Sequence, residues 1–313
     1  ETSYNVLLIE AGPADKNPWI HVPIGYGKNF RNPKINWMFQ TEPGEKWVKN
    51  RVPTPRGKVL GGSSSINGMV YMRGNPDDYN HWQQLGNAGW GFDDILPYFK
   101  KSQNQQRGEN HYHGTGGALW VSDPTEMHPI AEAYINAGIE AGYEFNPDFN
   151  GTMQNGFGPI QWTTKNGRRS SAATAYLNPV KSRKNLSIIS NGLVHKIIFK
   201  GMQAVGVEYE NAGQKFLVFA RKEIILSAGA IQSPQILQLS GVGKAEDLKQ
   251  IGVPIIADVS GVGENLQDHV NAPLLYKTRL SFTANKLYHN PIRKVKEGLK
   301  YVFFRKGMLA MGA

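Results

Sequence analysis

The sequence predicts an α/β fold with α+β elements. Three features predict it. Residues 5–9 form a short apolar run that is typical of a buried parallel strand, and the run ends in Glu10. Further β-rich runs between residues 186 and 227 are linked by glycine-containing turns, as in a meander. A strand-to-helix glycine turn follows them at Gly229.

Composition is that of an ordinary globular protein. The chain has 313 residues, 40% of them hydrophobic, and its 35 glycines indicate many tight turns. There is no cysteine, so neither a disulfide framework nor a thiolate metal site can form. No apolar run is long enough to cross a membrane as a helix.

The formal net charge is +10. Such a charge suits nucleic acid, an anionic membrane surface, or a chain whose acidic partner segments are missing. Lys and Arg are scattered, with the densest groups at residues 181–184 and 293–306, and no aromatic-basic nucleic-acid motif occurs. We therefore expect no nucleic-acid partner. Membrane-surface association stays open, and the expected location is cytoplasmic or peripheral at the inner face of a membrane.

One stretch organises the chain. Residues 56–74 read RGKVLGGSSSINGMVYMRG. Gly61 and Gly62 lack Cβ atoms, so the backbone can turn through positive φ and approach a ligand closely. The serines that follow could cap a helix start suited to a phosphate, or could cap an ordinary surface helix. The mostly apolar run from Ile66 to Tyr71, with one amide at Asn67, suits a backbone lying along a flat, partly polar ring.

A second stretch, residues 229–243, reads GAIQSPQILQLSGVG. It follows the expected strand 223–227, and Ser233-Pro234 predicts a helix N-cap with proline at the first helical position. Ser240 to Gly243 would end that helix. The element could touch a ligand or simply pack the fold.

These two stretches resemble the two signatures of the glucose–methanol–choline (GMC) oxidoreductases, which are FAD-dependent flavoenzymes, and the overall flow of the sequence is most similar to the choline and aliphatic-alcohol dehydrogenase branch. The resemblance covers the chain from Glu1 to about Ala313. It implies an FAD-binding Rossmann-like domain and a substrate domain, both incomplete. The cofactor-binding residues it implies are Glu10, Val59, Gly61, Gly62, Ser63, Asn67, Gly68, Met69, Val70 and Val194.

The chain departs from the family pattern at both ends. The glycine fingerprint expected about 20 residues before Glu10 is missing, and that acid either accepts hydrogen bonds from ribose hydroxyls or is idle. The family's catalytic His belongs to a C-terminal pattern that does not occur here, so we expect no catalytic residue within this sequence. Both departures predict a fragment that lacks both termini.

The expected domain organisation has four segments. Residues 1–115 form the first part of the FAD-binding domain, without its first strand and GxGxxG turn, and residues 166–271 form the second part. Residues 116–165 begin the substrate domain, and residues 272–313 start its second segment.

Several local elements are also predicted. Helices are expected after Asp77, near an N-cap at Asp93 or Asp94, and over residues 129–141 with an apolar side; a strand is expected at 118–122. Residues 167–177 predict a Ser-capped helix, and its two arginines could pair with phosphate or be solvated.

Three histidines are candidate site residues. His111 and His113 would point the same way on an extended segment, as a metal pair does, but the loop offers too few other ligands and we expect no metal. His269, in a family-like stretch, is expected to be structural because the family's base lies elsewhere.

The resemblance implies oxidation of a primary alcohol, choline-like or aliphatic, to an aldehyde by hydride transfer to FAD. Some family members link the flavin through a His just before the signature asparagine, where this chain has Ile66, so noncovalent FAD is expected. The expected partners are an alcohol substrate and an electron acceptor, either a quinone or carrier or O2. The alternatives are an O2-using oxidase, a lyase of the same family, and a catalytically inactive flavin-binding or structural module.

Overall fold

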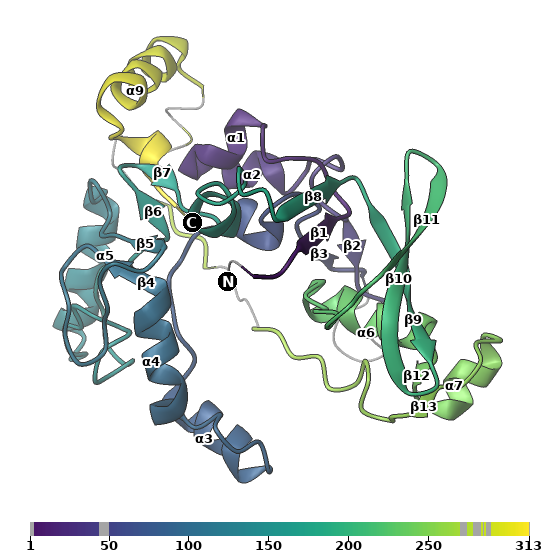
Figure 1. The fold of residues 1–313 in the computed structure, drawn as a ribbon. Helices are drawn as coiled ribbons and strands as arrows, with labels where there is room; N and C mark the ends of the chain where they lie inside the picture. Colours follow the sequence, from purple (N-terminus) through teal and green to yellow (C-terminus); the bar gives the residue numbers. More distant parts are fainter. Residues whose placement is uncertain are drawn as a thin grey trace. The chain divides into compact units, whose positions relative to one another are not determined.

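The computed structural model describes residues 3–43, 50–269, 274–277, 283, 285 and 289–312. Helices and short strands are mixed along the chain, as predicted for the α/β class. They form two compact units, one made of Glu1–Gly12 and Ser187–Arg279 and the other of Pro13–Leu186 and Leu280–Ala313. The α-helices and β-strands are labelled on the ribbon in Figure 1. The four-segment division expected from the sequence stays a prediction.

Strands dominate the smaller unit, where β1 pairs with β8, and β9, β10 and β11 form an antiparallel meander (Figure 1). Ala212 and Gly213, both at positive φ, make the two-residue turn between β10 and β11, which is the type I′ arrangement that matches strand twist. The predicted β runs between residues 186 and 220 are therefore confirmed. The strands are β1 (Val6–Glu10), β8 (Leu186–Ser190), β9 (Leu193–Lys200), β10 (Gln203–Asn211) and β11 (Gln214–Phe219).

Two predictions in the same unit are wrong. Residues 223–227 are not a strand and share no ladder of hydrogen bonds with a strand of the described part of the chain. Helix α6 (Gly229–Leu239) begins four residues before the predicted N-cap and contains Pro234 in its interior. Its C-terminal end is tied to β9, because Ser240 Oγ accepts a hydrogen bond from the Ile197 N–H at 2.7 Å.

Short elements follow α6. β12 (Val242–Gly243) pairs in parallel with β13 (Ala257–Asp258). The connection carries α7 (Ala245–Gln250), whose Leu248 is buried.

The larger unit contains the first motif and most of the helices. Its apolar core cluster is small, consisting of Ile20, Ile35, Val59 and Ile66 with Phe30 packed against them. Its elements are α1 (Pro18–His21), η1 (Pro23–Gly25), α2 (Tyr26–Asn29), β2 (Phe39–Gln40), β3 (Pro53–Thr54), η2 (Gly62–Ser65), α3 (Pro76–Gln84), α4 (Phe92–Ser102), β4 (Gln103–Gln105), β5 (Leu119–Val121), α5 (Pro129–Glu140), β6 (Thr164–Lys165), β7 (Arg168–Arg169), η3 (Ala173–Leu177), α9 (Pro291–Phe304) and η4 (Met308–Ala310).

The predicted helices of this unit are present with changed ends. α3 starts at its N-cap Asn75. The N-cap of α4 is Gly91, not Asp93 or Asp94, and Asp94 Oδ2 accepts a hydrogen bond from the Gly91 N–H at 3.2 Å. The acid therefore serves the helix start from the third helical position.

The apolar side predicted for α5 is not core. Tyr134 is 58% exposed, and the buried residue of this helix is Gly138. A Cβ on Gly138 would lie 2.4 Å from the Phe157 ring. The helix therefore approaches Phe157 most closely at a glycine, and the exposed Tyr134 ring lies beside the same phenylalanine.

Residues 164–177 form a hairpin and one turn of π-helix instead of the predicted helix. Asn166 and Gly167 are both at positive φ between β6 and β7. An Asn-Gly pair is a strong hairpin signal. These residues therefore form the turn of a hairpin and not the start of the predicted helix. The N-cap of η3 is Ala172, without a side-chain cap, so the predicted serine cap is also wrong; Ser171 Oγ, one residue earlier, accepts a hydrogen bond from the Thr174 N–H at 3.2 Å.

Helix α9 lies near the C-terminal end of the chain. Its N-cap Asn290 accepts a hydrogen bond from the Arg293 N–H. In the part of the chain that the structure describes, neither α9 nor any other helix is long and apolar enough to cross a membrane.

Candidate functional site

The first motif opens with the glycine turn that the sequence predicted. Gly61 has a φ of 89° and Gly62 a φ of 55°, and the Gly62 N–H donates to the Val59 carbonyl at 2.7 Å. A Cβ on Gly61 would lie 2.4 Å from Ser65 Oγ and 3.0 Å from Ala173 Cβ. A Cβ on Gly62 would meet no atom within 4 Å. Gly61 is thus required by packing inside the unit, whereas the space over Gly62 is open.

The serines fasten the loop rather than cap a long helix. Ser63 Oγ accepts from the Gly57 N–H at 3.0 Å, and Ser65 Oγ donates to the Leu60 carbonyl at 2.8 Å. The predicted helix start is a single 3-10 turn, η2. So short a turn aligns too few peptide dipoles to form a phosphate site at its N-terminus.

The second half of the motif divides its side chains between two environments. Ile66 and Met69 are each 1% exposed, and Val59 is fully buried. Asn67 and Val70 are exposed. The motif therefore has an inner side that belongs to the core and an outer side that offers backbone, one amide and one apolar side chain.

Met69 has an unusual backbone conformation. Its φ is 69°, which is uncommon for a residue with a long side chain. Three hydrogen bonds hold it: its N–H donates to Asn67 Oδ1 at 3.2 Å, and its carbonyl accepts from the Thr163 N–H at 2.8 Å and from the Thr163 hydroxyl at 3.3 Å. The preceding Gly68 is partly buried, and its carbonyl lies 2.8 Å from where a Cβ on Gly312 would be.

Arg169 lies beneath this loop. Its Nε donates to the Ile20 carbonyl at 2.7 Å, and its Nη1 donates to the Ser64 carbonyl at 3.0 Å and to Asn67 Oδ1 at 2.6 Å. Burial lowers the pKa of Arg169 to about 10. The guanidinium is therefore still charged at neutral pH.

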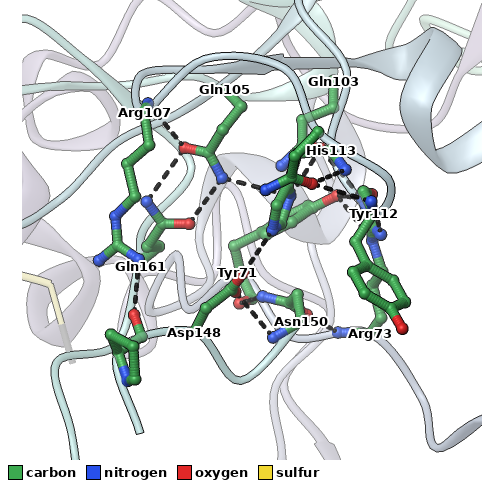
Figure 2. Close-up of polar contacts among 12 residues, drawn as sticks. Tyr71, Arg73, Gln103, Gln105, Arg107, Tyr112, His113, Asp148, Asn150 and Gln161 are labelled. Carbon is green, nitrogen blue, oxygen red and sulfur yellow. Dashed lines mark hydrogen bonds and ion pairs between the residues drawn. The ribbon is translucent and has the colours of Figure 1, made fainter. Parts of the chain in front are cut away.

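A buried polar network holds the far end of the motif (Figure 2). The Arg73 guanidinium donates to the Tyr112 carbonyl at 2.7 Å and to Gln103 Oε1 at 2.9 Å, and the Arg73 N–H donates to Asn150 Oδ1 at 2.7 Å. Asn150 Nδ2 in turn donates to the Tyr71 carbonyl at 3.0 Å. The end of the motif is thus fixed to residues far away in the sequence.

His113 is the centre of the same network (Figure 2). It is 2% exposed; its Nε2 lies 2.8 Å from Asp148 Oδ2, and its Nδ1 lies 3.1 Å from Gln103 Oε1. Burial opposes ionisation of Asp148, but hydrogen bonds from His113 and from the Asn150 N–H outweigh it and keep the pKa of Asp148 below its ordinary value. A pair of reciprocal amide hydrogen bonds between Gln105 and Gln161 borders the network.

The histidines do not form the arrangement considered from the sequence. His111 is exposed and packs edge-on against Tyr112, whereas His113 is buried, so the two rings do not point the same way. No group of three His, Asp or Glu side chains suited to a metal occurs among the residues described. His269 is exposed.

Glu10 and Val194 belong to the smaller unit. Glu10 Oε1 accepts a hydrogen bond from the Gly12 N–H at 2.8 Å, and the Glu10 carbonyl accepts from the Gly192 N–H at 2.9 Å. Val194 follows Gly192 closely, in β9, and pairs with Tyr209. The structure therefore brings the end of β1 next to the start of β9, and the remaining predicted site residues lie together in the other unit.

Sequence reasoning left the role of Arg169 open and missed that of Arg73. The signal for Arg169 was present: in the hairpin after Asn166-Gly167, successive side chains point to opposite faces. Arg168 is accordingly exposed and Arg169 buried. Nothing in the residues around Arg73 indicates its partners, which are up to 81 positions away.

Comparison with known proteins defines the class. Residues 37–271 match the GMC oxidoreductase family, and the chain belongs to that family, as its two motifs predicted.

The relatives it resembles are choline dehydrogenases. The chain is 44% identical over 306 residues to the oxygen-dependent choline dehydrogenase of Brucella anthropi, covering 97% of this chain and 55% of the relative. It is 42% identical over 314 residues to the mitochondrial choline dehydrogenase of Mus musculus, covering 98% and 52%. The chain thus spans about half the length of these relatives.

A solved structure shares the fold. An FAD-dependent oxidoreductase from Chaetomium thermophilum superimposes with a TM-score of 0.89 at 32% identity, over 98% of this chain and 56% of that one. The mixed α/β fold of this chain is therefore that of the corresponding half of a GMC oxidoreductase.

Gly61→Ala is expected to destabilise the fold more than Gly116→Ala. Both positions have positive φ, where a non-glycine residue costs about 1–2 kcal/mol. Only the Gly61 Cβ would also clash, with Ser65 Oγ, because nothing lies within 4 Å of a Cβ on Gly116. Denaturant unfolding of the two full-length variants measures the difference. An equal loss in the free energy of unfolding would show that the loop moves to accommodate the added Cβ without destabilising the fold.

Asp148→Asn is expected to weaken the acid dependence of stability. Because the folded pKa of Asp148 is lowered, its ionised form stabilises the fold above the unfolded pKa of about 3.9, and this contribution is lost as pH falls through the folded value. The free energy of unfolding of the variant should be about 1–2 kcal/mol lower than that of wild type at neutral pH. On acidification it should fall less than that of wild type. The free energy of unfolding of wild type and variant, measured between about pH 2 and pH 5, tests this; curves that stay parallel would contradict it.

Proposed function

We propose that the full-length protein is an FAD-dependent oxidoreductase that oxidises a primary alcohol, choline-like or aliphatic, to an aldehyde. The observation that carries the proposal is the GMC motif at residues 56–74, folded as a loop with its glycine turn at positive φ. Similarity to choline dehydrogenases supports the choline-like class of substrate.

The residues of the motif loop fit a flavin in three respects. The open space over Gly62 lets a ligand lie against the backbone. Asn67 and Val70 are exposed on the outer side of the loop, where an amide and an apolar surface suit a partly polar ring. Arg169, buried beneath, leaves its Nη2 without a hydrogen-bond partner in the described structure.

FAD, when bound, supplies the acceptor for the hydride that leaves the carbinol carbon. The residues of this chain that would hold it are Glu10, Val59, Gly61, Gly62, Ser63, Asn67, Gly68, Met69, Val70 and Val194. Ile66, which has no nitrogen to form a bond with the flavin, supports noncovalent binding. The base that takes the hydroxyl proton is a His by family resemblance, a residue type suited by its near-neutral pKa, and we place it outside this sequence.

The electron acceptor is a quinone or carrier, or O2. The relative from Brucella anthropi is named an oxygen-dependent choline dehydrogenase. That name does not decide between O2 and a quinone or carrier for this chain. Release of peroxide during turnover would distinguish an oxidase from a dehydrogenase. We propose no nucleic-acid partner. Two explanations of the positive charge are left: contact of the basic residues of α9 (Pro291–Phe304) with an anionic membrane surface, and pairing with acidic segments outside this sequence.

Gly62→Val should yield a folded protein largely without flavin. Valine is β-branched and poorly suited to positive φ, and its side chain would fill the open space over the loop. Gly86→Val is the matched control, because Gly86 also has positive φ and nothing within 4 Å of its Cβ. The ratio of flavin to protein absorbance is compared for both variants and wild type; full loading of Gly62→Val would refute a cofactor role for this turn.

Glu10→Gln should weaken FAD retention. The amide oxygen can still accept the hydrogen bond from the Gly12 N–H, so the turn after β1 keeps its contact while the charge is lost. A charge-assisted hydrogen bond to a ribose hydroxyl is worth about 1.5–3 kcal/mol, which predicts roughly tenfold or greater weakening. FAD titration of the flavin-free full-length protein measures it, and an unchanged dissociation constant would mean that the acid serves only the turn.

A further inference from the structure

Arg169 is a buried cation whose hydrogen-bond acceptors are all neutral. Its side chain contacts the carbonyl oxygens of Ile20 and Ser64 and the amide oxygen of Asn67. It is 3% exposed, and none of the ion pairs found among the described residues includes it. Its Nη2 is buried and has no hydrogen-bond partner there.

A buried charge in such surroundings costs free energy. Removing a guanidinium from water is expensive unless an opposite charge or a full set of hydrogen bonds compensates for it. Burial lowers the pKa of Arg169 only to about 10, so the residue does not escape the cost by losing its proton at neutral pH. A buried donor without a partner, on a side chain whose acceptors are all neutral, calls for an explanation other than stability.

The contact with Arg169 fixes which way the Asn67 amide points. A guanidinium has donors and no acceptor, so the Asn67 atom 2.6 Å from Arg169 Nη1 must be the oxygen. The Met69 N–H, which donates to the same oxygen at 3.2 Å, requires the same orientation. The amide nitrogen of Asn67 is therefore turned away from Arg169, on a residue that is exposed.

We propose that Arg169 is a positioning residue that holds the Asn67 amide with its N–H donors outward, toward a hydrogen-bond acceptor of the flavin. This inference rests on the proposed function. The short contact to a cation also polarises the amide and strengthens its N–H groups as donors. Asn67 touches the cofactor, and Arg169 acts through it.

Asn67→Asp isolates the outward donor. The carboxylate has nearly the same shape and can still accept hydrogen bonds from Arg169 and from the Met69 N–H, so the loop keeps its contacts and only the N–H donors are lost. Asn110→Asp is the matched control, because Asn110 is exposed and its Oδ1 likewise accepts two backbone hydrogen bonds, from Tyr112 and His113. The two variants carry the same change in charge.

Flavin-free full-length proteins are titrated with FAD, and the visible absorption spectrum of the bound flavin is recorded. Asn67→Asp is expected to weaken binding at least about tenfold and to shift the flavin bands, while Asn110→Asp leaves both unchanged. Unchanged affinity and spectrum in Asn67→Asp would overturn the inference and leave the proposed function standing. A wild-type protein that binds no flavin would overturn both.

Arg169→Lys tests whether the arginine acts through the amide. Lysine keeps the charge but cannot hold three acceptors in one plane. Arg169→Lys should raise the FAD dissociation constant several-fold in the wild-type background. In the Asn67→Asp background the same substitution should raise it little further, because both changes act on one contact. Equal weakening in both backgrounds would show that Arg169 does not act through Asn67.

Discussion

The larger unit depends on one buried charge. Arg169 joins the carbonyls of Ile20 and Ser64 to the side chain of Asn67, and these residues come from a helix, a 3-10 turn and a loop far from it in sequence. The guanidinium can do this because it offers five donors in a rigid plane. The apolar cluster nearby holds only a few residues, so the shape of the motif is set by directional polar contacts as much as by packing.

The same principle holds at the other end of the motif. Arg73 is 6% exposed and donates to Gln103 and to the Tyr112 carbonyl, and His113 links this group to Asp148. Buried polar groups are tolerated where nearly all of them are paired, and they then specify one arrangement more strictly than apolar contacts do. With a buried arginine at each end, the loop between them keeps a defined path although its outer side lacks packing partners.

Much of the fold could be predicted because its signals are local. The positive φ of Gly61 and Gly62, the meander and the presence of α3 follow from residue types in adjacent positions, although α3 begins slightly before the predicted Asp77. The errors arose where a local signal competed with a tertiary one. Ser233-Pro234 looks like a helix start, yet α6 begins at Gly229 and accepts the loss of one hydrogen bond at the proline. Likewise, the burial of Arg169 could be inferred only after the Asn166-Gly167 hairpin had been recognised in place of the predicted helix, because alternation of faces is a property of the strand.

The inner and outer sides of the motif restrict the choice of residue for different reasons. Residues on the inner side are restricted by stability and, under the proposed function, residues on the outer side by ligand binding. On the inner side, Gly61 is required by contacts with Ser65 and Ala173. On the outer side, Gly62 meets nothing within 4 Å, and stability alone would accept any residue that tolerates positive φ there, such as asparagine. The outward amide of Asn67 likewise adds little to stability beyond its oxygen, which an aspartate would also supply. Selective demands on these outer positions would therefore have to come from the ligand that lies against them.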